Sequence, residues 1–307
     1  MEYISGITEF NLSEPSVISL GKFDGLHRGH ELLIEYMLLK KQEGLKTVIF
    51  TFDVPPKKLL SQDETKVLTT NDEKMHIFER SGIDYLIECP FTQEIMCMEP
   101  FDFIKKIVEE LDVKAMVVGK DFHFGHNRAG DYHTLQYYAK ELGYEVNVVD
   151  KMQYENRDIS STFIREEIMA GNIEKANELL GYHYFVQGTV EHGKHLGGPV
   201  LGFPTANLVP PDNKLLPSFG VYITQIEVDK TLYQGIANVG CKPTIEGENP
   251  IGVEMHIFDF EQNIYGKEIR VDFLSRVRAE LKFDSMDELK EQMNKDIAFA
   301  RTYFKNN

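Results

Sequence analysis

The alternation of two hydrophobic periods between residues 16 and 150 constrains the fold more than any other feature of the chain. Short β-branched and apolar runs, such as SVISL at 16–20 and KTVIFTF at 46–52, alternate with amphipathic stretches such as 31–44. Strand and helix periods that take turns favour crossover connections. The pattern therefore predicts a parallel sheet covered by helices on both faces, with functional groups at the carboxyl ends of its strands.

The pattern changes after residue 181 to strand-like segments separated by glycine and proline, which predicts a small antiparallel barrel or sandwich. A final amphipathic segment, 285–304, begins with Ser285 three residues before Glu288, the spacing of a capping box. Its apolar stripe, which starts at Met286, is expected to pack on the barrel. With two helix-like pieces at 161–181 closing the first half, we expect domains at 1–182 and 183–307.

Composition restricts the class of partner. A chain of 307 residues with 42% hydrophobic content is large enough for two cores. The 33 basic and 49 acidic side chains give a net charge of −16, which repels nucleic acid and anionic membranes. The three cysteines form no C-x-x-C pair, and the first residues do not have the pattern of a signal peptide. We expect a cytoplasmic protein acting on small molecules, with self-association left open.

The segment GKFDGLHRGH at 21–30 follows the first predicted strand of the sheet. Gly21 and Gly25 permit a close turn, and Gly29 allows a phosphate to approach the backbone where a helix begins. His27 and His30, three residues apart, point the same way and can donate hydrogen bonds to phosphate oxygens. Alone, the two histidines could equally be a surface coincidence or a weak metal pair. The strand, the glycines and the helix around them favour a phosphate site.

Two further segments of the first half carry polar or aromatic side chains. In ISSTFIR at 159–165, serine and threonine hydroxyls can cap a helix, and Arg165 offers a planar fork to a polyphosphate. A simple helix cap is the alternative. In VVGKDFHFGHNRAGD at 117–131, an aromatic loop follows a strand that ends at Gly119. An ordinary strand-to-helix connection, with Phe122 and Phe124 filling the core, is the alternative there.

The second half contains its own candidate site in GFPTAN at 202–207. A glycine-rich loop precedes Thr205 and Asn207, whose hydroxyl and carbonyl are hard oxygen ligands suited to Mg²⁺. A loop shaped only by turn geometry explains the segment about as well. Glu254 lies in a strand pattern, where a lone acid would ordinarily face solvent. Arg276 and Arg278 could line a ligand or remain on the surface.

Taken together, these segments resemble known enzyme families. The G-x-F-D-G-x-H-x-G-H segment is similar to the nucleotide-binding signature of the FAD synthetase branch of the nucleotidyltransferases. The segments GFPTAN, GIANVGCKPTI, VEMHIFDF and FLSRVRAELKF occur in the order seen in riboflavin kinases. From about residue 16 to 301, the chain therefore resembles the bacterial bifunctional riboflavin kinase/FMN adenylyltransferases.

The resemblance implies an α/β nucleotidyltransferase-like (Rossmann-like) parallel-sheet domain, followed by a small antiparallel β-barrel domain with a C-terminal helix. It implies that riboflavin is phosphorylated to FMN by ATP, and that a second ATP adenylylates FMN to FAD with release of pyrophosphate. Mg²⁺ is the implied metal, held by Thr205 and Asn207, and Glu254 is the implied base. The other implied catalytic residues are His27, His30 and Arg165. Flavin binding is implied for Asp121, Phe122 and Arg276. Nucleotide binding is implied for Gly21, Phe23, Asp24, Gly25, Gly29, Ser160, Ser161, Thr162, Gly202, Pro204, Thr205 and Asn207.

The chain departs from the family pattern at four positions. Val54 and Pro55 replace a proline and a histidine near the expected adenylylation pocket, Pro199 replaces an arginine of the kinase loop, and Lys242 stands where arginine is common. These departures keep two alternatives open. Either only one of the two sites is active, the kinase site being the more doubtful of the two, or the chain is a non-catalytic flavin-binding regulator. An adenylyltransferase for another small phosphate would leave the kinase-like segments without a role.

Overall fold

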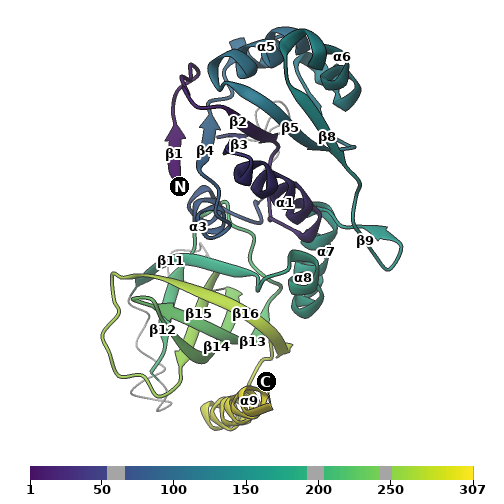
Figure 1. Ribbon diagram of the computed structural model, residues 1–307. Helices are drawn as coiled ribbons and strands as arrows, with labels where there is room; N and C mark the ends of the chain where they lie inside the picture. Colours follow the sequence, from purple (N-terminus) through teal and green to yellow (C-terminus); the bar gives the residue numbers. More distant parts are fainter. Residues whose placement is uncertain (54–65, 192–203, 242–250, 307) are drawn as a thin grey trace. The chain divides into compact units, whose positions relative to one another are not determined.

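Residues 1–53, 66–191, 204–241 and 251–306 are described by the computed structural model. They divide into two units, Met1–Ser161 and Thr162–Asn307 (Figure 1). The predicted domain boundary at 182/183 falls about twenty residues after this division and stays a prediction.

The first unit is built on a six-stranded sheet in which every neighbouring pair is parallel, as the sequence predicts. In spatial order its strands are β1 (Glu2–Ser5), β4 (Tyr85–Cys89), β3 (Lys46–Phe52), β2 (Ser16–Leu20), β5 (Val113–Gly119) and β8 (Glu145–Val149). Its helices are α1 (Arg28–Gln42), α3 (Asn71–Arg80), α4 (Gln93–Cys97), α5 (Pro100–Glu110) and α6 (Tyr132–Leu142). Two short hairpins and a 3₁₀ turn complete it: β6 (His123–Phe124), β7 (Gly130–Asp131), η1 (His126–Arg128), β9 (Gln153–Tyr154) and β10 (Arg157–Asp158).

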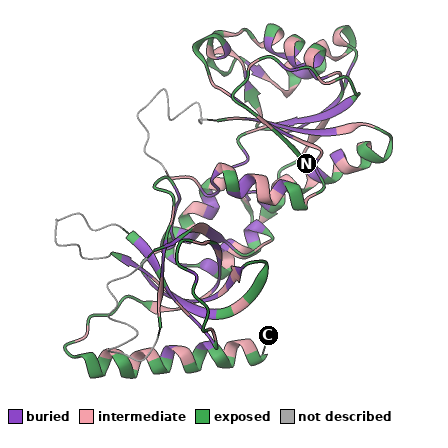
Figure 2. Ribbon diagram, turned by 90° about the vertical axis from the view of Figure 1, so that its left-hand side faces the viewer, coloured by how far each residue is buried: buried purple, intermediate pink, exposed green. Residues whose placement is uncertain are grey.

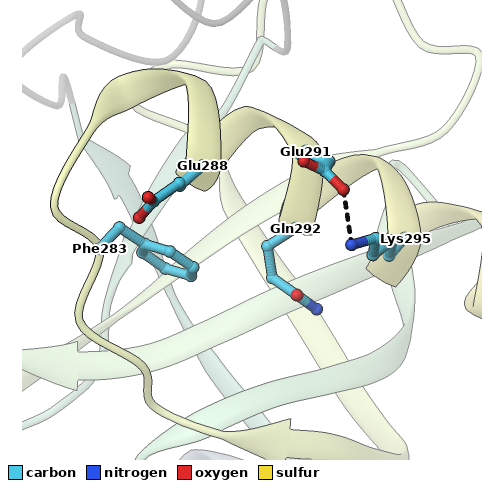
Figure 3. A pocket seen from close by; sticks show the side chains of 5 residues that line it. All are labelled: Phe283, Glu288, Glu291, Gln292 and Lys295. Carbon is cyan, nitrogen blue, oxygen red and sulfur yellow. Dashed lines mark ion pairs between the residues drawn. The ribbon is translucent and has the colours of Figure 1, made fainter.

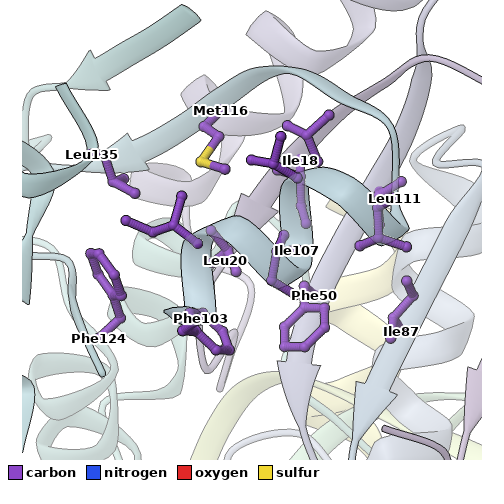
Figure 4. Close-up of a cluster of buried hydrophobic side chains, with 14 of the residues drawn as sticks. Ile18, Leu20, Phe50, Ile87, Phe103, Ile107, Leu111, Met116, Phe124 and Leu135 are labelled. Carbon is purple, nitrogen blue, oxygen red and sulfur yellow. The ribbon is translucent and has the colours of Figure 1, made fainter. Parts of the chain in front are cut away.

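Helices cover the sheet on both sides, because alternate residues of its strands point to opposite faces. On one face Ile18 and Phe50 pack with Phe103 and Ile107 of α5 in a buried cluster (Figure 4). Helix α1 contacts β2, β3 and β5 and buries Met37, which lies outside that cluster. Both faces are therefore covered, and the four central strands β2 to β5 are buried along most of their length (Figure 2).

The strand order identifies the boundary between β2 and β5 as the expected position of a ligand site. The order runs β4, β3, β2 in one direction and β5, β8 in the other, so the direction of winding reverses between β2 and β5. In open α/β sheets the carboxyl ends of the strands at such a reversal enclose the ligand crevice. The segments that follow Leu20 and Gly119 are therefore the expected location of a site.

The second unit is a closed barrel of six antiparallel strands. In spatial order the strands are β11 (Phe185–Glu191), β12 (Ala206–Val209), β15 (Ile251–Ile257), β14 (Thr231–Cys241), β13 (Gly220–Val228) and β16 (Glu268–Ala279). Helices α7 (Ser161–Ala170), α8 (Ile173–Leu180) and α9 (Met286–Asn306) accompany it. The fold expected from the resemblance, with its parallel sheet, barrel and C-terminal helix, is confirmed.

Helices α7 and α8 carry residues that bind the barrel. The side chain of Asn177 in α8 donates to the carbonyl of Phe273 at 2.8 Å and accepts from the backbone N–H of Tyr184 at 2.7 Å. Tyr184 and Phe273 are themselves hydrogen-bonded to each other at 2.8 Å, so Asn177 ties α8 to one end of the β11–β16 pair and makes it part of the barrel unit.

Helix α9 packs on the barrel through only part of its predicted stripe. The hydroxyl of Ser285 accepts from the N–H of Glu288 at 3.2 Å, which confirms the predicted cap. Ile297 packs with Ala300 against a barrel cluster, whereas Met286 is 47% exposed. In the described parts of the chain, no helix combines the length and the apolar character that a membrane span requires.

Candidate functional site

The turn after β2 carries the first candidate site. The N–H of Gly21 donates to the carbonyl of Phe50 at 3.1 Å, which keeps the chain beside β3 as it leaves the sheet. Phe23 and Gly25 then adopt positive φ angles of 47° and 68°. The turn ends at His27, the N-cap of α1, so the helix begins directly above the carboxyl end of a central strand. This is the geometry in which backbone N–H groups bind phosphate.

The two predicted histidines stack on each other at the start of α1, with ring centroids 3.9 Å apart. The N–H of His27 donates to Nδ1 of His30 at 3.3 Å. Because Nδ1 of His30 acts as the acceptor, a neutral His30 carries its proton on Nε2. Nδ1 of His27 is buried and makes no hydrogen bond within the described residues. The structure thus brings both imidazoles together beside the helix N-terminus.

Enclosure keeps both imidazoles uncharged near neutral pH. Burial lowers the pKa of His27 to about 4, although the carboxylate of Asp121 opposes the shift. Burial also lowers the pKa of His30 well below its usual value, and the neighbouring His27 adds to the effect. The structure therefore favours neutral imidazoles, which can donate hydrogen bonds through a ring N–H without carrying a formal charge.

The ISST segment lies against the same turn. The carbonyl oxygen of Ile159 is 3.9 Å from the position that a Cβ on Gly29 would occupy. The hydroxyl of Ser161, the first residue of α7, donates to the carbonyl of Asp24 at 2.6 Å. Ser160 directly precedes α7, and Arg165 follows Ser161 by one helical turn. Two distant parts of the sequence therefore meet at the candidate phosphate site.

The loop after β5 lies on the other side of the point where the winding reverses. Asp121 is close enough to His27 to raise its pKa, and Lys151 pairs with the Asp121 carboxylate at 3.2 Å. Phe122 is half-buried and stacks on Phe124 with ring centroids 5.4 Å apart. The loop therefore combines an exposed carboxylate with a partly exposed aromatic surface, while Phe124 fills the core as the alternative reading expects.

The second candidate site is a row of polar residues across the outside of the barrel. Glu191, Asn207, Glu254 and Asn238 are register partners on the successive strands β11, β12, β15 and β14. Residues paired in register share a face. Their chain neighbours Val190, Leu208, Val253 and Val239 are buried, so the polar row points away from the barrel interior.

Thr205 completes this site by direct contact. Its hydroxyl donates to the Glu254 carboxylate at 2.7 Å, and Nδ1 of His256 lies 2.9 Å from the carbonyl of Pro204. Asn207 is 7% exposed although its row faces outward. The structure therefore brings Thr205, Asn207 and Glu254 together. Glu191 and Asn238 escape sequence reasoning, because only the register places them in the same row.

Several predicted site residues make other contacts in the structure or fall outside the described residues. The Arg276 guanidinium donates to the carbonyl oxygens of Phe219 at 3.0 Å and Ala170 at 3.4 Å, so it braces α7, and its flavin contact stays a prediction. Thr162 lies in the first turn of α7, exposed. Gly202 and the four departures from the family pattern, Val54, Pro55, Pro199 and Lys242, fall outside the described residues.

A shallow pocket of about 230 Å³ lies along α9 of the second unit (Figure 3). It is lined by Phe283, Glu288, Glu291, Gln292 and Lys295, and Lys295 pairs with Glu291 across one helical turn at 2.7 Å. None of the site residues predicted from the sequence lines it. The pocket is a separate feature from the Thr205–Glu254 contact.

A parallel nucleotide-binding sheet joined to a closed antiparallel barrel, each with its own polar site, defines a two-domain enzyme that handles nucleotides. Residues 10–163 match the family model described as FAD synthetase, and residues 180–304 match the one described as riboflavin kinase. The chain belongs to the family of bifunctional riboflavin kinase/FMN adenylyltransferases.

Individual relatives support this assignment over nearly the whole chain. The protein of that name from Listeria monocytogenes is 35% identical over 291 residues, which cover 94% of this chain and 92% of the relative. The one from Bacillus subtilis is 34% identical over 298 residues, with 95% and 93% covered. A solved structure described as a macrolide-efflux protein from Streptococcus pneumoniae is 32% identical, has a TM-score of 0.87 and covers 95% of each chain.

Proposed function

We propose that the chain converts riboflavin to FMN in its barrel unit and FMN to FAD in its parallel-sheet unit, with one ATP consumed at each site. The observation that carries this proposal is the pair of separate polar sites, the histidine pair at the winding reversal and the Thr205–Glu254 contact on the barrel. The names of the family models and of the relatives agree with this division.

In the parallel-sheet unit, a phosphate oxygen of FMN attacks the α-phosphorus of ATP, and the bond to pyrophosphate breaks. No protein nucleophile is needed, so positioning and charge stabilisation supply the rate. His30 donates through Nε2–H and His27 through a ring N–H, while Arg165 is proposed to bind the polyphosphate as a planar fork. Asp121 and Phe122, at the facing loop, are proposed to contact the flavin.

In the barrel unit, Glu254 takes the proton from the 5′-hydroxyl of riboflavin, and that oxygen attacks the γ-phosphorus of ATP. A base must reach the hydroxyl that it deprotonates, and Glu254 lies on the outer face beside Thr205 and Asn207. The Thr205 hydroxyl orients the Glu254 carboxylate through their hydrogen bond. The phosphate donor is therefore proposed to bind over β12.

Mg²⁺ fits the donor set of the barrel site. The Thr205 hydroxyl and the Asn207 carbonyl are hard oxygen ligands two residues apart at the start of β12, and the Glu254 carboxylate is in contact with Thr205. When bound, the ion would neutralise the charge of the ATP phosphates. We assign the binding of this ion to Thr205 and Asn207.

We also propose that the chain works in the cytoplasm on small molecules and does not bind nucleic acid. A net charge of −16 supports the second point, since it opposes association with a phosphate backbone. Small nucleotide substrates can still bind in spite of this charge, because a few N–H donors at the start of a helix act on their phosphates at short range.

The test is to incubate the purified protein with riboflavin, ATP and Mg²⁺ and to separate the flavins by chromatography. We expect FMN to appear first and FAD to follow. Glu254→Gln should stop FMN formation but leave FAD formation from added FMN intact. Glu268→Gln, at an exposed position of β16 outside the polar row, is the matched control and should leave both reactions unchanged. Loss of both reactions in folded Glu254→Gln would contradict two separate sites.

A further inference from the structure

We propose that Asp24 is a positioning residue of the adenylylation site, which acts by holding the Leu68–Thr69 segment against the phosphate-binding turn and does not contact the nucleotide. The inference rests on the proposed function of the first unit. It also revises the role that the family resemblance implies for Asp24, since the sequence alone groups this residue with those that bind the nucleotide.

The Asp24 carboxylate points into the protein. Its side chain is 3% exposed, although it belongs to a turn that is expected to receive ATP. Oδ1 accepts two backbone N–H groups, from Leu68 at 2.7 Å and from Thr69 at 3.2 Å. Oδ2 lies 3.4 Å from the ammonium group of Lys22, whose side chain is largely exposed. The buried oxygen Oδ1 therefore accepts hydrogen bonds from the backbone of a segment more than forty residues away in the sequence.

The same segment contacts the turn at a second point. The N–H of Gly25 donates to Oγ1 of Thr69 at 3.0 Å. A Cβ on Gly25 would lie 2.7 Å from Cδ1 of Leu68, so only glycine allows this approach. Gly25 also has a φ of 68°, which other residues rarely adopt. The turn therefore contacts the Leu68–Thr69 segment at two successive residues, Asp24 and Gly25.

The backbone of Asp24 extends this connection to a third segment. Its carbonyl accepts the hydroxyl hydrogen of Ser161 at 2.6 Å. One residue therefore joins the phosphate-binding turn, the start of α3 and the start of α7. Next to Thr69, Thr70 caps α3 by accepting from the N–H of Glu73 at 3.3 Å, so the position of that helix depends on the same segment. His27 and His30 follow within six residues on the turn that these contacts fix.

These contacts predict that the shape of the side chain matters more than its charge. Asp24→Asn keeps an oxygen in the place of Oδ1. It loses the negative charge, which faces the half-exposed ammonium of Lys22 and makes smaller electrostatic contributions at His27 and Lys74, and ion pairs open to solvent on one side contribute little. Asp24→Ala leaves two buried N–H groups without an acceptor and lets the turn move. A shift of about 1 Å at donors aimed at the reacting phosphate is expected to slow the reaction roughly 100-fold.

The experiment measures FAD formation from FMN by the full chain carrying Asp24→Asn or Asp24→Ala. Riboflavin phosphorylation by the same samples shows that the barrel unit is intact, and urea unfolding followed by circular dichroism checks that the parallel-sheet unit is folded. We expect Asp24→Asn to stay within about threefold of the wild type and Asp24→Ala to fall by about 100-fold in kcat, with phosphorylation unchanged in both. Hydrogen exchange of the Leu68 and Thr69 amides should accelerate only in Asp24→Ala.

The following outcomes test the positioning role of Asp24 and separate it from the proposed function. If Asp24→Asn is as inactive as Asp24→Ala, the carboxylate charge acts on the substrate and the positioning role is wrong. Wild-type activity in Asp24→Ala would also overturn it. Should Asp24→Ala fail to fold, Thr69→Val, which removes the acceptor for Gly25, must slow adenylylation while Thr69→Ser preserves it. A wild-type chain that makes no FAD from FMN would refute the proposed function itself, whatever the variants do.

Discussion

The burial of His27 predicts a specific loss of stability in mild acid. Burial lowers the pKa of this imidazole from 6.5 to about 4 in the folded chain. Between these two values the unfolded chain binds a proton that the folded chain does not, so stability falls as the pH falls. At neutral pH and above, both states are uncharged at this residue and the contribution to the pH dependence vanishes.

The magnitude follows from the difference between the two pKa values. At about 1.4 kcal/mol per pKa unit, the full effect is about 3.4 kcal/mol, and it is reached below pH 4. Between pH 7 and pH 5, His27 is expected to contribute a loss of about 2 kcal/mol of unfolding free energy in the wild type, and the lowered pKa of His30 adds to this loss. His27→Asn removes the titrating group and should lose about 2 kcal/mol less over the same interval.

The assay is urea unfolding of the wild type and His27→Asn at pH 7 and pH 5, followed by circular dichroism. His133→Asn, at an exposed position in α6 of the same unit, is the control and should behave as the wild type does. If the wild type and His27→Asn lose equal stability on acidification, the imidazole is not buried in its neutral form. The view that the pair acts through uncharged donors would then be refuted.

Two other predictions concern the framework around the sites. Arg278 of β16, which is partly exposed, forms an ion pair at 2.8 Å with the buried Asp296 of α9, so Arg278→Met leaves a buried carboxylate without this cation and should destabilise the barrel unit by about 3 kcal/mol. Thermal unfolding would show this, and an unchanged Tm would contradict it. Gly25→Ala should destabilise the parallel-sheet unit more than Gly44→Ala, because both positions have positive φ but only Gly25 would contact Leu68. Equal losses in urea unfolding would show that this contact is tolerated.

Sequence patterns predict the fold where a local period reflects burial. The alternation before residue 150 and the change after 181 predict the parallel sheet and the barrel correctly, because strand and helix periods record which side chains face a core. The edge strand Glu2–Ser5 is absent from that prediction, since it is exposed and lacks an apolar run. Helices α7 and α8 show why boundaries are harder. Their amphipathic faces do not reveal which core they contact, and Asn177 decides it through contacts with distant backbone.

The residues of the candidate sites likewise include some that a local motif predicts and others that depend on distant contacts. Local motifs place His27, His30, Thr205 and Asn207, because a glycine-rich turn at a helix or strand start can be read in one stretch of sequence. The row that adds Glu191 and Asn238 to Glu254 depends on strand register, which no local pattern specifies. Arg276 shows a contact that the sequence does not indicate, because its guanidinium donates to the carbonyl of Ala170 at the end of α7, while its flavin contact stays a prediction.

The central claim is that one chain holds two separate ATP sites, one in each unit. The most direct measurement is the binding stoichiometry of a non-hydrolysable ATP analogue with Mg²⁺, determined by equilibrium dialysis for the wild type and for His30→Ala and Asn207→Ala. We expect two sites in the wild type and one remaining site in each variant. A single site in the wild type, or loss of all binding in either folded variant, would contradict it.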